Sequence, residues 1–192
     1  GMRAVIELKK DADVERTLAA LYKYSELQDT VGVNMVAIAD GKPMQMGLKT
    51  ILAHYIRHQK EVVTRRTRYD LEQAKARAHI LEGLIIAVDN LDEVIRLIRA
   101  SKTPKEARER LIAAFNLTEI QAQAILDMRL QRLTNLEILT LRNEYAEVLK
   151  RIKYLESILK SEKKLISVIR DELMEIREKY ADARRTQLVG AF

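Results

Sequence analysis

The chain has 192 residues, a length that usually corresponds to one domain or to one domain with an extension. It has no cysteine, which excludes disulfides, thiolate metal sites and a cysteine nucleophile and fits a cytoplasmic protein, and no apolar run approaches the roughly 18 residues that cross a bilayer. Charged residues make up 32%, prolines number two and the net charge is +6, so we expect long helices with either an anionic partner or a solvated basic face.

The sequence of residues 1–46 predicts a small α+β base. Its helix follows a cap at Asp11 or Asp13 and ends near Leu27. Asp40-Gly41 is a turn signal between two of the expected strands. Alternating or β-rich runs predict short strands at 3–8, 33–38 and 42–46.

Residues 47–90 predict one long outgoing helix. No proline interrupts residues 48–88, and Gly83 is the only glycine among them. Such a helix would be about 60 Å long, which few single globules can house. Its apolar seam is weak and repeats at sevens, through Tyr55, Val62, Tyr69 and Ala76.

Residues 91–134 predict a compact knob of short helices. Asp89-Asn90 breaks the long helix, and Thr103 caps a new helix with Pro104 in its first turn. Asn116 closes that helix. Thr118 opens the next one with Gln121 at the capping-box position, and we expect it to run to about Leu133.

Residues 135–188 predict a returning long helix that is broken near residues 160–161. Heptad spacing predicts a seam, which a helical period then continues beyond the break. The seam residues are Leu141, Tyr145, Val148, Ile152, Leu155 and Leu159, then Leu165, Ile169, Leu173, Ile176 and Tyr180. The fold class is therefore mainly α, with long antiparallel coiled-coil arms, a compact helical knob and a small α+β base with two or three short strands.

Catalytic motifs are missing from the sequence. No glycine-rich phosphate loop occurs. His54 and His58 have the i, i+4 spacing of metal ligands, but Tyr55 stands where a catalytic zinc helix carries Glu, and no cysteine completes a site. His79 stands beside apolar residues and is expected to be packed. We therefore predict no catalytic, cofactor-binding or metal-binding residue.

Two stretches could bind a partner. The basic run from Arg65 to Arg68 could bind phosphates without reading sequence, or it could be a solvated helix face. Residues 118–133 place apolar side chains around more than one side of a short helix, so one side could meet another chain. The alternative is that all of these side chains pack within the knob.

Three long motifs carry a family resemblance. EVVTRRTRYDLEQAKARAHILEGL at 61–84, TEIQAQAILDMRLQRLTNLE at 118–137 and IRDELMEIREKYADARRT at 169–186 resemble the A subunit of bacterial DNA gyrase in order and spacing. VGVNMVAIADGKP at 31–43 adds a fourth match, and the A subunit of topoisomerase IV is a close relative. Asn135 replaces a glycine of many relatives, and we expect it to keep a left-handed turn or to cap the next helix.

The resemblance implies a segment of a homodimeric, ATP-dependent type II DNA topoisomerase that supercoils DNA in the bacterial cytoplasm. Residues 1–46 would end the tower domain, residues 47–90 and 135–188 would form the arms, and residues 91–134 would form the exit gate for the transported duplex. The catalytic tyrosine would lie in a preceding domain, so this segment alone should be inactive. Mg²⁺ and ATP would act through the gyrase B subunit of the full heterotetramer.

The same resemblance suggests which residues meet partners. The dimer interface would comprise Ile120, Gln121, Ala124, Ile125, Met128 and Leu130. Double-stranded DNA would pass Arg57, Arg65, Arg66 and Arg68, which could contact its backbone, and no membrane partner is expected. Two rival functions remain: an autonomous basic helical module that coats nucleic acid as a monomer, and a structural coiled-coil adaptor that dimerises through the long seam.

Overall fold

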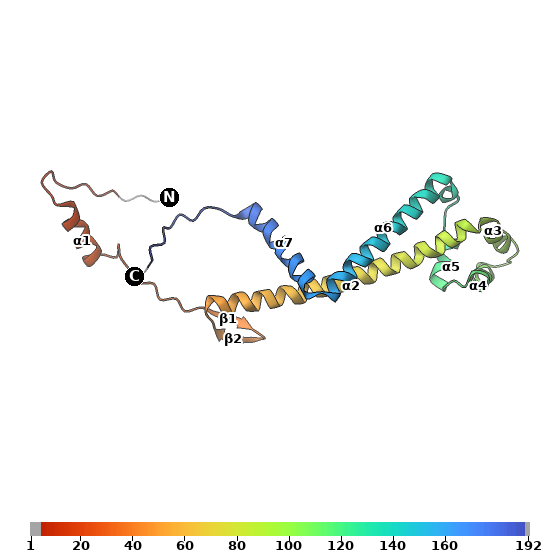
Figure 1. The fold of residues 1–192 in the computed structure, drawn as a ribbon, viewed down its shortest axis with the longest axis horizontal. Helices are drawn as coiled ribbons and strands as arrows, with labels where there is room; N and C mark the ends of the chain where they lie inside the picture. The colour runs from red at the N-terminus through yellow and green to blue at the C-terminus, as the bar shows by residue number, and fades with distance from the viewer. Residues whose placement is uncertain (1–4, 191–192) are drawn as a thin grey trace. The chain divides into compact units, whose positions relative to one another are not determined.

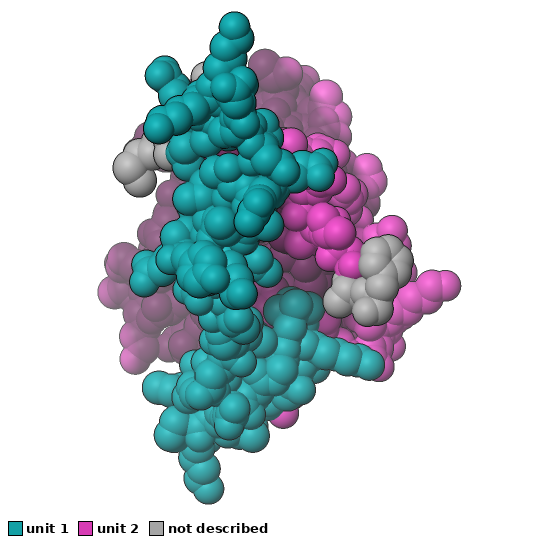
Figure 2. All heavy atoms as spheres, turned by 90° about the vertical axis from the view of Figure 1, so that its left-hand side faces the viewer, with its two compact units in different colours: residues 1–54 teal, residues 55–192 magenta. Residues whose placement is uncertain are grey.

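The computed structural model describes residues 5–190, and the chain divides into two compact units, residues 1–54 and 55–192 (Figure 2). The fold is mainly α with a small β part, as the sequence predicts (Figure 1). The elements are α1 (Val14–Tyr24), β1 (Val36–Ala39), β2 (Lys42–Gln45), α2 (Leu48–Asp89), α3 (Leu91–Arg99), α4 (Pro104–Phe115), α5 (Glu119–Leu126), the 3-10 turn η1 (Leu130–Leu133), α6 (Asn135–Lys160) and α7 (Glu162–Tyr180). No helix in the described part of the chain is both long and apolar enough to cross a membrane.

The first unit contains α1 and a β-hairpin. Asp13 caps α1, because its Oδ1 accepts a hydrogen bond from the Arg16 backbone N–H at 3.1 Å. Strands β1 and β2 pair antiparallel across Asp40 and Gly41, which both have positive φ as a two-residue hairpin turn requires. The expected strand at 3–8 is wrong for residues 5–8, which pair with no neighbouring strand, and residues 3–4 lie outside the described residues.

Helix α2 buries a different face from the one predicted. Tyr55, Tyr69 and Ala76 are exposed, and the buried positions lie on the other side of the helix. Small side chains dominate that side, so another helix can approach closely. The sequence-based prediction was wrong because it assigned the bulky tyrosines to the buried face. The buried α2 positions of the second unit are Val63, Thr67, Ala74, Ala78, Leu81, Gly83 and Ala87. Thr67 fits there because its hydroxyl donates to the Val63 carbonyl at 2.7 Å.

Helix α6 returns along α2, and α7 bends away after the break (Figure 1); together with residues 55–89 we call these two helices the arm. Leu141 and Leu155 are buried, as the heptad seam predicts. Ser161 breaks the return and caps α7 by accepting from the Lys164 backbone N–H. Beyond Ile169 the predicted seam is wrong, because Leu173, Ile176 and Tyr180 are exposed.

Ion pairs join the two sides of the arm. Each joins partly exposed groups, so its own contribution to stability is small. The pairs are Lys60–Glu162, Arg66–Glu172, Asp70–Arg151, Lys75–Glu156, Arg77–Glu144 and Asp89–Arg142.

Residues 91–134, the knob, surround an apolar cluster at the end of α2. Ala87 of α2 belongs to this cluster, together with Val94 of α3 and Leu111 of α4. Leu117, Ala122 and Ile125 complete the cluster from the α4–α5 connection and from α5. The knob is therefore a small packed core built onto one long helix.

Local signals set the helix boundaries in the knob. Asn116 has a left-handed φ of 52° and ends α4, as predicted. The expected helix to Leu133 is wrong, because α5 ends at Leu126 and η1 follows. Asn135 is not left-handed and does not cap; it is the first residue of α6, so the chain turns without the geometry that glycine supplies.

The Arg77–Glu144 pair predicts an acid-sensitive component of stability. A hydrogen bond from Arg77 and its charge hold the pKa of Glu144 below its ordinary value of 4.5. The pair therefore stabilises the fold fully above pH 4.5, and this contribution is lost as the pH falls through the lowered pKa. We expect Glu144→Gln to lower the free energy of unfolding at pH 7 by less than about 1 kcal/mol and to have a smaller effect at pH 3.

Urea unfolding of wild type and Glu144→Gln between pH 3 and pH 7 measures this difference. Glu178→Gln is the matched control, because Glu178 makes no ion pair within residues 5–190. An effect of Glu144→Gln that stays constant over the whole pH range would contradict the assignment.

Candidate functional site

The knob is seated on the arm by a close contact between α5 and α2. A Cβ at Gly83 would lie 2.7 Å from Gln121 Cβ and 2.8 Å from its Cγ, closer than carbon atoms pack. Only glycine therefore lets the Gln121 side chain lie against the α2 backbone. The sequence shows Gly83 as the lone glycine of the long helix, but it does not show which residue needs the space.

Hydrogen bonds hold that contact in place. Gln121 Nε2 donates to the His79 carbonyl of α2 at 2.8 Å, and Gln121 Oε1 accepts from the Thr118 backbone N–H at 3.0 Å. Thr118 Oγ1 accepts from the Gln121 backbone N–H and lies 2.7 Å from His79 Nε2. The predicted capping box is thus confirmed, and it also joins the knob to the arm.

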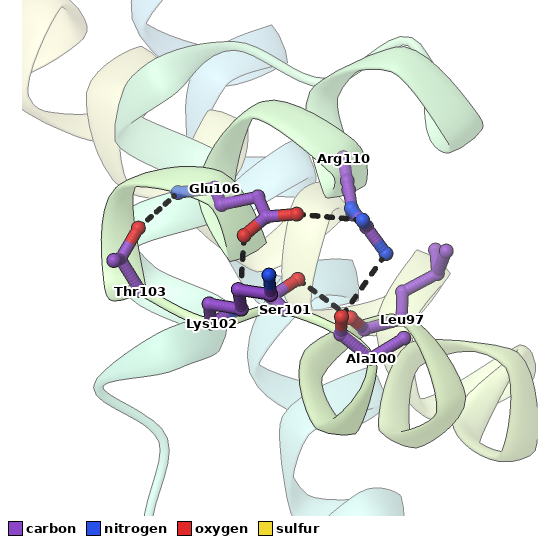
Figure 3. Close-up of polar contacts among 7 residues, drawn as sticks. All are labelled: Leu97, Ala100, Ser101, Lys102, Thr103, Glu106 and Arg110. Atoms are coloured by element: carbon purple, nitrogen blue, oxygen red, sulfur yellow. Dashed lines mark hydrogen bonds and ion pairs between the residues drawn. The ribbon is translucent and has the colours of Figure 1, made fainter.

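A second polar cluster makes the α3–α4 turn of the knob rigid (Figure 3). The Glu106 carboxylate accepts from the Lys102 backbone N–H at 2.9 Å and from Arg110 at 2.6 Å. Thr103 caps α4 by accepting from the Glu106 backbone N–H. Ser101 donates to the Leu97 carbonyl and closes the end of α3. The turn between α3 and α4 is therefore tied by side chains rather than left free.

The residues predicted to meet a second chain divide by exposure. Gln121 and Ile125 are about 5% exposed; Gln121 lies against α2 and Ile125 belongs to the apolar cluster, so within this chain they can only support a surface from behind. Ala124 and Met128 are half-buried. Ile120 is 63% exposed and Leu130 is 82% exposed. The dimer interface itself stays a prediction.

Two further apolar side chains were missed by the sequence reading. Leu136 is 73% exposed at the start of α6, and Leu139 is exposed one turn later. The heptad seam begins at Leu141, so the earlier leucines were not identified as surface residues. Their i, i+3 spacing on the same helix was the signal that could have found them.

The basic residues of α2 also separate into two environments. Arg66 pairs with Glu172 of α7, so its charge is neutralised within the arm. Arg65 and Arg68 are exposed on the face of α2 opposite the buried positions, and neither makes a hydrogen bond or ion pair within residues 5–190. Arg57 is exposed on the same helix. DNA contact by these residues stays a prediction.

The carboxylates whose pKa values are lowered belong to ion pairs. A side-chain hydrogen bond from Lys75 lowers the pKa of Glu156, one from Lys60 lowers that of Glu162, and one from Arg96 lowers that of Glu93. None of these pairs approaches a nucleophile. Residues 5–190 contain no group of three His, Cys, Asp or Glu side chains arranged to hold a metal ion.

Residues 1–174 match the family model for the A subunit of DNA gyrase and topoisomerase IV. The chain is 56% identical over 191 residues to the DNA gyrase A subunit of Clostridium acetobutylicum. It is 52% identical over 193 residues to that of Staphylococcus aureus and 47% identical over 188 residues to that of Dehalogenimonas lykanthroporepellens. These matches cover 98–100% of the chain but only 22–23% of each relative, so the chain spans less than a quarter of their length.

The Gly83 contact predicts an unusual helix substitution. On an open helix, glycine to alanine stabilises by about 1 kcal/mol. At Gly83 we expect Gly83→Ala to lower the free energy of unfolding instead, by about 1–3 kcal/mol, because the new Cβ overlaps Gln121. Urea unfolding measures it.

The control for Gly83→Ala is Ala76→Gly, on an exposed position of the same helix. It reports the helix-propensity contribution alone. If Gly83→Ala stabilised the chain by as much as Ala76→Gly destabilised it, the contact would carry no constraint.

Proposed function

The chain belongs to the family of DNA gyrase and topoisomerase IV A subunits, and from that membership we propose that it forms the arm and exit gate of a DNA gyrase A subunit. The knob would dimerise with a second copy, and the paired arms would enclose the duplex that leaves after strand passage. The observation that carries the proposal is the set of exposed leucines and isoleucine on and beside the knob. For the whole protein we propose DNA strand cleavage, DNA supercoiling and a location in the bacterial cytoplasm.

Exposed apolar side chains near one end of the second unit support self-association. Ile120, Leu130, Leu136 and Leu139 are all exposed. Charged residues make up 32% of the chain, so enough polar side chains are available to cover a surface of this size. Large apolar side chains that form one contiguous patch are typical of a protein interface, and we propose that these four form such a patch. A two-fold axis would use the same patch on both copies, so one segment suffices to build the gate.

A gate must hold but also open, and the knob suits that requirement. Its own core and tied α3–α4 turn let it act as a rigid body whose interface separates without unfolding. The buried Gln121 and Ile125 would hold the interface residues from behind. Opening would then break only the contacts between copies.

The exposed arginines of α2 support passage of DNA. Arg65 and Arg68 would meet phosphates of any sequence, which suits a duplex that moves through rather than binds at a site. Arg66 would contribute to the arm through Glu172. The catalytic tyrosine, Mg²⁺, ATP and the gyrase B subunit would act elsewhere in the assembly, and this segment would have no catalysis of its own.

The names of the relatives favour gyrase over topoisomerase IV. The family model covers the A subunits of both enzymes, but the relatives compared above all belong to gyrase, at 47–56% identity. An arm and gate would serve either enzyme in the same way.

The dimer proposal predicts which substitution separates the copies. Leu130→Asp would place a charge in the apolar interface, and we expect sedimentation equilibrium to show a mass near 22 kDa, that of the single chain, instead of twice that mass. Ile176→Asp on α7 is the matched control, because Ile176 is 53% exposed but lies far along the returning helix.

The two rival functions predict different masses for the wild-type chain, namely a monomer for the module that coats nucleic acid and a dimer for the coiled-coil adaptor. If Ile176→Asp rather than Leu130→Asp split the dimer, the long seam would be the interface and the adaptor function would hold. A wild-type chain that is already monomeric at micromolar concentration would contradict self-sufficient dimerisation by this segment.

The DNA proposal predicts a salt dependence. For Arg65→Gln/Arg68→Gln we expect weaker binding of a random duplex and a slope of log affinity against log salt that is smaller by about 2. Arg170→Gln/Arg177→Gln removes the same charge from exposed positions of α7. Fluorescence anisotropy over a salt series measures both, and equal effects of the two double variants would show non-specific attraction to net charge.

A further inference from the structure

A cavity lies where the arm meets the knob, and its lining includes Ala124 and Met128, two of the residues predicted for the dimer interface. Its volume is about 430 Å³, within the range of pockets that bind small molecules. Leu84 of α2, Met128 beyond α5 and Leu141 of α6 give it an apolar lining. A bound molecule would therefore contact three segments that are far apart in the sequence.

Three arginines also line this cavity. Arg77 is already paired with Glu144 at 2.7 Å. Arg132 Nε is 3.9 Å from Glu137 Oε2, which is beyond hydrogen-bond distance. Arg129 makes no hydrogen bond or ion pair with any other described residue. The Arg129 guanidinium therefore lines the cavity without a partner among the described residues.

The carboxylates that line the cavity make no ion pair with Arg129. Asp127 Oδ1 accepts from Gln123 Nε2 at 3.0 Å, and Glu137 lies beside Arg132. When Glu144, the partner of Arg77, is counted, three carboxylates balance the three guanidinium groups around the cavity. A preference for an anionic ligand therefore rests on Arg129, which makes no ion pair with another described residue.

We propose that this cavity binds a small molecule with an apolar body and a single carboxylate. The body would pack on Leu84, Met128 and Leu141, and the carboxylate would accept paired hydrogen bonds from Arg129, with Arg132 as the second cation. This assignment goes beyond the exit-gate function and does not depend on it.

The position of the cavity gives such a ligand a mechanical consequence. Arg129 directly precedes the exposed Leu130, and Leu84 lies one residue from Gly83, where α5 is seated on α2. A molecule bound to both would tie residues 127–133 to the arm. It would therefore restrict the segment that carries part of the proposed interface.

One methionine makes the test specific. Met128 lines the cavity, and the other described methionines (Met35, Met44, Met46 and Met174) lie elsewhere in the chain. The full chain labelled with ¹³C at methionine methyl groups is titrated with 2-naphthoate at constant salt and pH. We expect a saturable shift of the Met128 methyl signal and no comparable shift of the other four.

Variants identify the carboxylate contact. Arg129→Gln should raise the Kd of 2-naphthoate about tenfold or more, because it removes charge-assisted hydrogen bonds. Arg65→Gln removes the same charge from an exposed position outside the cavity and should leave the Kd unchanged. The neutral 2-naphthylmethanol, of similar size, should bind the wild type at least about tenfold more weakly.

Three outcomes would overturn the assignment. The first is a Met128 signal that does not saturate up to millimolar 2-naphthoate. The second is an equal change of Kd in Arg129→Gln and Arg65→Gln. The third is equal binding of naphthoate and naphthylmethanol, which would show apolar adsorption alone. The exit-gate proposal does not require a bound ligand, so failure of these measurements leaves it intact.

Discussion

Helix α5 lies against α2 at Gly83, where the absence of a side chain lets Gln121 reach the α2 backbone. The orientation of the knob depends on this contact, because Gln121 and Thr118 are both bonded to His79 there and Ala122 and Ile125 enter the apolar cluster beside it. A displaced α5 would also move residues 127–133, which follow it directly. The surface offered to a second copy is therefore set by a contact between two helices inside one chain.

The arm and the knob use different physical means. The arm relies on small buried residues such as Ala74 and Ala78 and on partly exposed ion pairs, each of which contributes little to stability. The knob relies on a compact apolar cluster with capped helices.

Sequence reasoning succeeded where the signal was local. The caps at Thr103 and Thr118, the left-handed Asn116 and the break at Ser161 each follow from the chemistry of a few adjacent residues. It failed where a neighbouring helix decides the outcome. The buried face of α2 follows the close packing of alanines rather than the bulk of Tyr55 and Tyr69, and Gln121 is buried because Gly83 leaves room for it. Exposure of Leu136 likewise needs the folded chain, because a leucine beside a heptad seam is easily taken as part of it.

The central claim is that two copies meet through Leu130 and its apolar neighbours, and site-specific crosslinking tests it most directly. The chain has no cysteine, so Leu130→Cys introduces a single thiol at the proposed symmetric surface, and Leu188→Cys introduces one at an exposed position in the segment after α7. Under mild oxidation the account predicts rapid formation of a covalent dimer through position 130 and little through position 188. Equal rates at the two positions, or faster crosslinking at position 188, would contradict it.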